Sequence, residues 1–141
     1  MAVTQLSFLL EGVSVKGTKK MGRGVYTQQA IEAGTLIETA PVIVMNAEER
    51  ILLDKTLLHD YIFEWGEKAD RCCMALGLVP MYNHSYEANC EYEMHFGKEV
   101  IAVKAMRDIE AGEQLFVNYN GDWDNKEKVW FEAHISAPDG K

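Results

Sequence analysis

The feature of this sequence that most constrains its fold is a series of short apolar runs separated by glycine or polar turn residues. The runs are rich in valine, isoleucine and threonine, which favour extended strands. They are LSFLL, VSV, VYTQQAI, TLIETAPVIVM, VIAVKAM and LFVNY. A glycine-rich turn is predicted at 17–24, and DYIFEW alternates with the period of a strand. The pattern predicts a mainly β domain with non-local strand pairing, and argues against a helical bundle or a βαβ fold.

Two short helices are predicted from capping signals. Asn46 and Glu49 have the spacing of a capping box, which predicts a helix over Ala47–Leu53. Asp124 and Glu127 repeat that spacing near the C-terminus, where an aromatic pair follows. We therefore expect a second short helix, of one or two turns, after residue 124.

One tetrapeptide, IEAG, occurs at 31–34 and again at 109–112, each time ahead of an apolar strand. Its glycine permits a left-handed backbone at the turn into the strand. The repetition is too short for a repeat architecture. The repetition indicates either the same type of turn used twice or a deeper symmetry that relates the two segments.

Length and charge limit the classes of function. A length of 141 residues suits a single domain with a hydrophobic core. The formal net charge of −8 argues against a grip on nucleic-acid phosphates, which requires a basic face. It fits a basic partner, such as a lysine-rich protein segment, and equally a role in solubility. No apolar run approaches the roughly 20 residues that span a bilayer, so no membrane association is expected.

The cysteines and the N-terminus indicate a reducing compartment. Cys72 and Cys73 are adjacent and Cys90 makes the count odd, which suits neither ordinary disulfides nor metal spacing. We interpret all three as small buried hydrophobic residues. The first residues lack the charged and apolar regions of a signal peptide. A cytoplasmic location is expected, or the host nucleus if the protein is a delivered effector.

Several site hypotheses find little support in the spacing. The Asn-His-Ser sequence at 83–85 fits a glycosylation acceptor, but that modification needs a secreted protein. His84, Cys90 and His95 fit no zinc pattern, so no metal site is predicted. A protease pair of Cys90 and His134 has no local signature to support it.

A cluster of aromatic residues is the strongest candidate for a site. Taken singly, each tyrosine is typical of a half-buried core residue with a bonded hydroxyl. Together with Asn83 and His84 they indicate a polar pocket walled by aromatic rings, which attracts a cationic sulfonium or ammonium group. The aromatic residues are Tyr82, Tyr86, Tyr92, Tyr119 and Trp123.

Three segments carry a family resemblance. GRGVY at 22–26 is weak alone, because the dinucleotide fingerprint needs a third glycine. NHSYEANCEY follows at 83–92 and DIEAGEQLFVNY at 108–119. In this order they resemble the motifs of SET-domain protein lysine methyltransferases, from about residue 6 to Trp123. The resemblance implies a mainly β fold of the β-clip type, with several small curled sheets, short helices and a C-terminal pseudoknot.

The resemblance also implies a single domain over 1–141. Its core would span about 6–123, and a helical segment at about 124–135 would close the site. Threading of the C-terminal segment would bring Asn83 and His84 beside the final tyrosine, Tyr119.

The resemblance further assigns roles to individual residues. The backbone of Arg23 and Gly24, with the side chains of Asn83 and His84, would bind S-adenosylmethionine, which leaves as S-adenosylhomocysteine. Trp123 would cover the adenine. Tyr119 would be the catalytic tyrosine and Tyr92 a second catalytic position beside the target amine. A tyrosine there tends to restrict the number of methyl groups, so mono- or dimethylation is expected.

The match departs from the family at several positions. Ala88 replaces a usual proline, Tyr86 a frequent cysteine and Pro80 an arginine that many members carry. No cysteine follows Tyr119, so the zinc-bound module that closes many members is not expected. Residues 120–135 or a partner would then close the site, and self-association into a homodimer is one such closure.

These observations lead to one main hypothesis with two alternatives. The main hypothesis is an S-adenosylmethionine-dependent N-methyltransferase acting on a lysine of a basic protein such as a histone. A catalytically silent SET-like module that binds cofactor or peptide is the first alternative. A structural domain whose tyrosines belong to the core is the second. The sequence does not identify the substrate.

Overall fold

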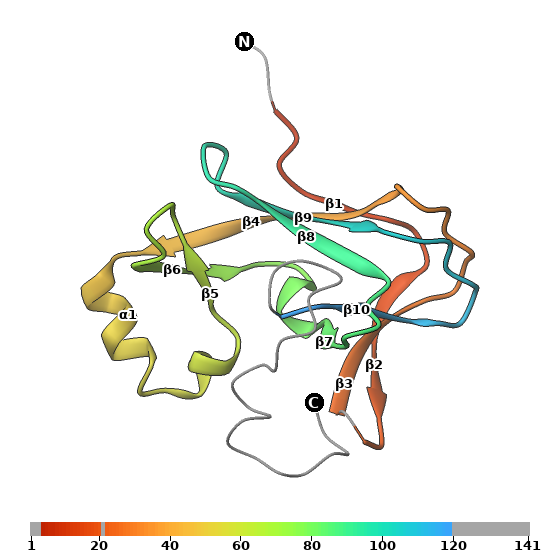
Figure 1. Cartoon of the computed structure of the whole chain (residues 1–141), viewed down its shortest axis with the longest axis horizontal. Coiled ribbons are helices and arrows are strands. Elements are labelled where there is room, and N and C mark those ends of the chain that lie inside the picture. Colours follow the sequence, from red (N-terminus) through yellow and green to blue (C-terminus); the bar gives the residue numbers. More distant parts are fainter. Residues whose placement is uncertain (1–3, 21, 120–141) are drawn as a thin grey trace.

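The computed structural model describes residues 4–20 and 22–119 (Figure 1). The strands in this part of the chain form two sheets. The larger has strand order β5-β6-β4-β9-β8, with β1 also paired to β4; the smaller has order β2-β3-β10-β7. The larger sheet contains β1 (Phe8–Leu9), β4 (Leu36–Met45), β5 (Phe63–Trp65), β6 (Arg71–Ala75), β8 (Cys90–His95) and β9 (Val100–Ala105). The smaller contains β2 (Val13–Thr18), β3 (Gly22–Thr27), β7 (Asn83–His84) and β10 (Gln114–Val117). The helices are α1 (Ala47–Leu53) and the 3₁₀ turns η1 (Leu57–Asp60) and η2 (Val79–Met81).

The mainly β architecture and small curled sheets agree with the sequence prediction. Strand β4 is the organising strand, because it pairs antiparallel with β9 along one edge and with β1 and then β6 along the other. Pro41 lies where β4 passes from β1 to β6, so its missing N–H interrupts neither ladder. The strand alternates over much of its length and sends Ala40 and Val42 into the core.

The hydrophobic core is built from both sheets. Burying such side chains contributes roughly 1.5–3 kcal/mol each, which makes this core the main source of stability. Its largest fully buried apolar residues are Trp65, Tyr82, Ile37, Ile101, Ile109, Leu115, Val25 and Val103. Cys72, Cys73 and Cys90 are also fully buried with free thiols, as their interpretation as small hydrophobic residues required. Burial raises the pKa of the Cys73 and Cys90 thiols to about 12.

The predicted helix over Ala47–Leu53 is confirmed with the same bounds. Asn46 Oδ1 accepts from the Glu49 N–H at 2.8 Å, and Glu49 Oε1 accepts from the Asn46 N–H at 3.0 Å. The capping box is therefore complete. The predicted helical segment after residue 124 lies outside the described residues. No helix in the described ranges is long and apolar enough to cross a bilayer.

Some local predictions were wrong. The turn predicted at 17–24 is present at residues 19–20 but is shorter than expected, because β2 continues through Thr18 and β3 begins at Gly22. In 60–65 only Phe63–Trp65 is a strand. Thr56 Oγ1 accepts from the Leu58 N–H at 3.2 Å and caps η1, which extends into the predicted strand.

The two IEAG segments pair with each other. Ile31 and Ile109 form an isolated antiparallel bridge, with N–H···O bonds of 2.8 Å in both directions. Gly34 donates its N–H to Ala105 at the end of β9, four residues before the second IEAG. Gly112 donates its N–H to Thr27 at the end of β3, four residues before the first. The contacts are reciprocal, which favours a local two-fold symmetry over independent use of one turn.

Candidate active site

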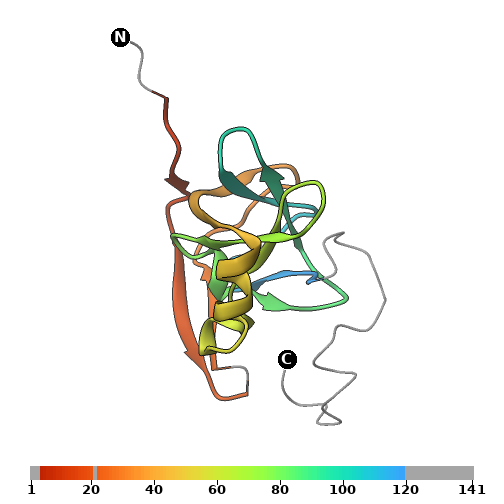
Figure 2. The ribbon, with the colours of Figure 1, turned by 90° about the vertical axis from the view of Figure 1, so that its left-hand side faces the viewer.

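Strand β10 brings the three motif segments together. It pairs antiparallel with β3, where Leu115 is opposite Val25, and parallel with β7, where Phe116 is opposite Asn83. Both views place the blue β10 beside the green β7 (Figures 1 and 2). Strand β10 is thus seated between two earlier parts of the chain. The Asn-His segment lies beside the strand that leads to Tyr119.

A buried amide fixes this arrangement from the side of β8. Asn89 is 1% exposed, and its Nδ2 donates to the Gln114 carbonyl at 2.9 Å. Its Oδ1 accepts from the Phe116 N–H at 2.8 Å. One side chain therefore pairs with β10 as a strand backbone would. Asn89 lies within the motif at 83–92, where the family resemblance assigns it no role.

Asn83 joins β7 to β3 and β10. Its side chain is buried, and its Nδ2 donates to the Arg23 carbonyl at 3.0 Å and to Gln114 Oε1 at 2.9 Å. A methyl group at Gly24 would collide with both Gln114 Oε1 and Asn83 Nδ2. Only glycine lets the two side chains approach the β3 backbone here. Arg23 and Gly24 thus meet Asn83 through their main chain, and the Arg23 side chain is exposed.

His84 is hydrogen bonded to the end of β10. Its Nδ1 accepts from the Tyr119 backbone N–H at 3.0 Å, so this nitrogen carries no proton. The His84 ring makes an edge contact with Tyr86 at 4.5 Å between centroids. It also lies 5.1 Å from the Tyr119 ring. His84, Tyr86 and Tyr119 therefore form one aromatic group beside Asn83.

Tyr119 is held by its hydroxyl as well as by its backbone. The hydroxyl donates to the Tyr82 carbonyl at 2.9 Å. Burial raises the pKa of Tyr119 well above its usual range, and the nearby phenols of Tyr92 and Tyr61 raise it further. The residue is thus a neutral phenol at physiological pH. It can donate and accept hydrogen bonds but is unsuited to act as a general base.

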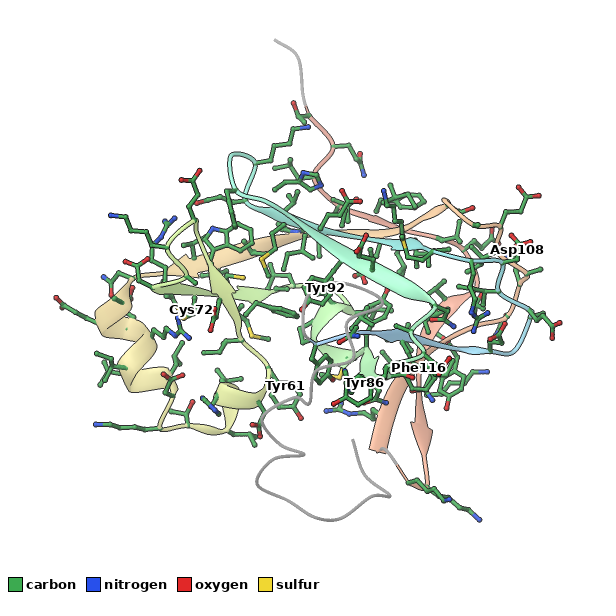
Figure 3. All side chains as sticks on the ribbon, viewed as in Figure 1. Tyr61, Cys72, Tyr86, Tyr92, Asp108 and Phe116 are labelled. Atoms are coloured by element: carbon green, nitrogen blue, oxygen red, sulfur yellow. The ribbon has the colours of Figure 1, made fainter. Side chains whose placement is uncertain are left out.

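Tyr92 and Tyr61 complete a group of tyrosines around Tyr119. Burial raises the pKa of Tyr92 to about 12, with a smaller contribution from Glu64. The Phe63 ring packs edge-on against Tyr92 at 5.3 Å. Figure 3 labels Tyr61, which follows η1, Tyr86, which lies between β7 and β8, and Tyr92, which lies in β8.

Sequence reasoning missed Tyr61 as a site residue. It lies just after η1, where its N–H donates to the Leu58 carbonyl at 2.9 Å. The alternation in 60–65 indicated that Tyr61 and Phe63 share a side, but no spacing signal linked Tyr61 to Tyr119.

The other site predictions concern metals and the C-terminal segment. Across residues 4–20 and 22–119, no group of three or more His, Cys, Asp or Glu side chains is arranged to hold a metal ion. Trp123 and the segment 124–135 lie outside the described residues, so their assigned roles stay predictions.

Known proteins resemble this chain in sequence and in fold. A family model, SET domain, matches residues 22–120. A Schizosaccharomyces pombe protein, histone-lysine N-methyltransferase, H3 lysine-37 specific, is 31% identical over 126 residues, covering 89% of this chain and 80% of the relative. The zebrafish (Danio rerio) N-lysine methyltransferase KMT5A-A is 29% identical over 136 residues, covering 88% of this chain and 38% of the relative. The crystal structure of a Plasmodium falciparum protein shares the fold with a TM-score of 0.64. It is 24% identical and covers 82% of this chain and 98% of its own.

Proposed function

Because this chain belongs to the SET-domain family and is a protein lysine methyltransferase, we propose that its methyl donor is S-adenosylmethionine. The methyl group passes to a lysine side chain of a basic protein such as a histone, and S-adenosylhomocysteine is released. The observation that carries the proposal is the meeting of Asn83, His84 and Tyr119 where β7 pairs with β10. No observation on residues 4–20 and 22–119 favours a catalytically silent binding module.

The residues around Asn83 fit a nucleoside with an amino-acid tail. Because Gly24 has no side chain, the backbone polar groups of β3 lie beside the Asn83 and Gln114 side chains. The buried Asn83 amide and the His84 ring add a polar group and an aromatic face. Such a mixture suits adenosine and a charged amino acid. The backbone of Arg23 and Gly24, with Asn83 and His84, would hold the cofactor here.

The tyrosines suit the target amine. When bound, the cofactor supplies an activated methyl group. The bond from this carbon to sulfur breaks as its bond to the lysine Nζ forms, and the electron pair of the broken bond stays on sulfur. The attacking lysine must be neutral. The Tyr61 and Tyr92 phenols lie near enough to Tyr119 to act on its pKa. Together these three side chains would desolvate the ammonium and lower its pKa, which favours proton loss to solvent. Alignment by the fixed Tyr119 hydroxyl then supplies much of the acceleration.

The net charge and the relatives support a basic substrate. The chain has a formal charge of −8, which attracts a lysine-rich segment at long range. The Schizosaccharomyces pombe relative is named for a lysine of histone H3. We therefore propose a histone tail, and histone H3 first, as the substrate to test. The position of Tyr92 supports mono- or dimethylation, which mass spectrometry of the product distinguishes from trimethylation.

Calorimetric titration with S-adenosylmethionine tests the cofactor proposal. We expect one-to-one binding by the wild-type protein and its loss in Asn83→Ala. Asn46→Ala is the matched control, because Asn46 is an exposed cap of α1 away from the site. It should bind as the wild type does, although the lost cap lowers stability by about 1 kcal/mol. Equal binding by Asn83→Ala, or no binding by the folded wild type, would contradict the proposal.

A further inference from the structure

Glu38 is a buried carboxylate that belongs to none of the motif segments. It is 2% exposed and lies in β4, where a register irregularity separates Leu36 from Glu38 in the pairing with β9. Ile37 and Glu38 are both buried, although neighbouring strand residues normally face opposite sides. A bulge can redirect side chains in this way, and bulges are common beside active sites.

Glu38 holds both ends of the turn that leads into β7. Its Oε2 accepts from the Leu78 N–H at 2.7 Å, at the start of η2. Its Oε1 accepts from the Tyr82 hydroxyl at 3.0 Å, at the end of η2. Gly77 has φ 71°, and a methyl group there would collide with Glu38 Oε2. The turn is thus built closely around this carboxylate.

Tyr82 connects Glu38 to the candidate catalytic residue. The Tyr82 side chain is 2% exposed and is tied to Glu38, while its carbonyl accepts from the Tyr119 hydroxyl. The next residue in the chain is Asn83 of β7. Anything that moves Tyr82 therefore moves the acceptor that sets the direction of the Tyr119 hydroxyl.

Core packing alone does not account for a carboxylate at this position. Burial raises the Glu38 pKa, and the hydrogen bonds from Leu78 and Tyr82 oppose that rise only in part. The neighbouring inward residues of β4, Ala40 and Val42, are apolar. A carboxylate offers two acceptor oxygens, and this turn supplies two donors. Glutamine offers one acceptor, so it would leave an N–H group facing a donor.

We infer that Glu38 is a positioning residue for methyl transfer, fixing the Tyr82 carbonyl and through it the Tyr119 hydroxyl. The inference rests on the proposed function, because it concerns the same tyrosine. It predicts that Glu38 acts on the rate of transfer while leaving cofactor affinity nearly unchanged. It also predicts that the environment of the Tyr119 ring depends on a carboxylate that acts through Tyr82.

The test uses Glu38→Gln, Tyr82→Phe and the double variant, with Val42→Ala as the control. Val42 is a buried apolar residue on the same strand, so its truncation weakens the core without touching the turn. Kinetics with S-adenosylmethionine and recombinant histone H3 give kcat and KM. Tyrosine labelled with ¹³C at Cζ reports the Tyr119 hydroxyl by NMR, and Tyr119→Phe assigns its signal among the six tyrosines.

We expect kcat to fall about tenfold or more in Glu38→Gln and in Tyr82→Phe, since small misplacements of aligned groups lower rates strongly. The double variant should be no slower than the slower single variant, because both changes break one link. The KM for S-adenosylmethionine should stay within about twofold. The Tyr119 signal should shift in both single variants. Val42→Ala should lower the melting temperature and leave kcat and the signal unchanged.

An unshifted Tyr119 signal in folded Glu38→Gln, or fully additive losses in the double variant, would overturn the inference. If Glu38→Gln does not fold, Tyr82→Phe decides alone, because it removes the hydroxyl that Glu38 holds and keeps the carbonyl. If wild type transfers no methyl group, the NMR comparison still tests the role of Glu38. The absence of transfer would contradict the proposed function, while the NMR result would decide the role of Glu38.

Discussion

The backbone N–H of Tyr119 donates to Nδ1 of His84 at 3.0 Å, although the two residues are 35 positions apart in the chain. This bond extends the parallel pairing of β7 with β10, in which Val117 is opposite His84. The proposed cofactor residues and the proposed catalytic tyrosine are therefore parts of one hydrogen-bonded unit.

Gly24→Ala should weaken cofactor binding. The added methyl group would collide with Gln114 Oε1 and Asn83 Nδ2, so these side chains must move away from β3. We expect a loss of stability of about 1–3 kcal/mol and at least about tenfold weaker binding of S-adenosylmethionine. Calorimetry and urea denaturation measure the two effects.

Gly17→Ala is the matched control for that variant. Gly17 lies opposite Arg23 on the neighbouring strand β2, and a methyl group there would meet no atom within 4 Å. Its stability should change by less than about 0.5 kcal/mol and its affinity should not change. If both variants bind S-adenosylmethionine as the wild type does, the proposed cofactor site is wrong.

Glu38 should make stability fall as pH rises above 4.5. Burial raises its pKa in the folded state above the usual glutamate value of 4.5, so the folded protein retains this proton where the unfolded chain has lost it. Its contribution to stability is therefore complete at low pH and declines up to the folded pKa. Glu38→Gln has no titratable proton at this position, so its stability lacks this dependence on pH.

Urea denaturation at about pH 4, 5.5 and 7 checks the sign of this effect. The free energy of unfolding of Glu38→Gln, minus that of the wild type, should increase with pH. A difference that is constant or that decreases would show that burial does not raise the pKa of Glu38.

The paired IEAG turns should respond alike to substitution. Gly34 has φ 86° and Gly112 has φ 90°, in the left-handed region where a side chain is strained. Each change to alanine should lower stability by roughly 1–2 kcal/mol, and the two values should agree closely because their contacts are reciprocal. Gly97→Ala should have little effect, because Gly97 lies outside the left-handed region and has the same open space around it as Gly34 and Gly112. Melting curves that show a large loss at one turn and none at the other would exclude the symmetry.

Local signals in the sequence were sufficient for part of the fold. The start of α1 follows from a capping box whose two hydrogen bonds lie within four residues of chain. The long strands β4 and β9 follow from runs of β-branched residues. The order of the motifs led to the family and its mainly β fold. These features depend on near neighbours or on recognisable spacing.

Other features depend on contacts that no local signal contains. The glycines at 17–24 suggested a turn. Position 24 instead requires a glycine because the Asn83 and Gln114 side chains, from distant parts of the chain, pack against it. Glu38 has the appearance of an exposed strand residue until the turn at Leu78 is brought onto it. Tyr61 joins the tyrosine group only through the tertiary fold.

The most direct test of the central claim is methyl transfer from labelled S-adenosylmethionine to recombinant histone H3 by the wild type and by Tyr119→Phe. The variant keeps the ring and loses the hydroxyl that donates to Tyr82. We predict label on a lysine side chain with the wild type and a rate about a hundredfold lower with the variant, whose cofactor affinity is unchanged. Transfer at the full rate by Tyr119→Phe would contradict the role of Tyr119. A wild-type protein that binds the cofactor but labels no lysine on H3 or the other core histones would contradict the proposed substrate class.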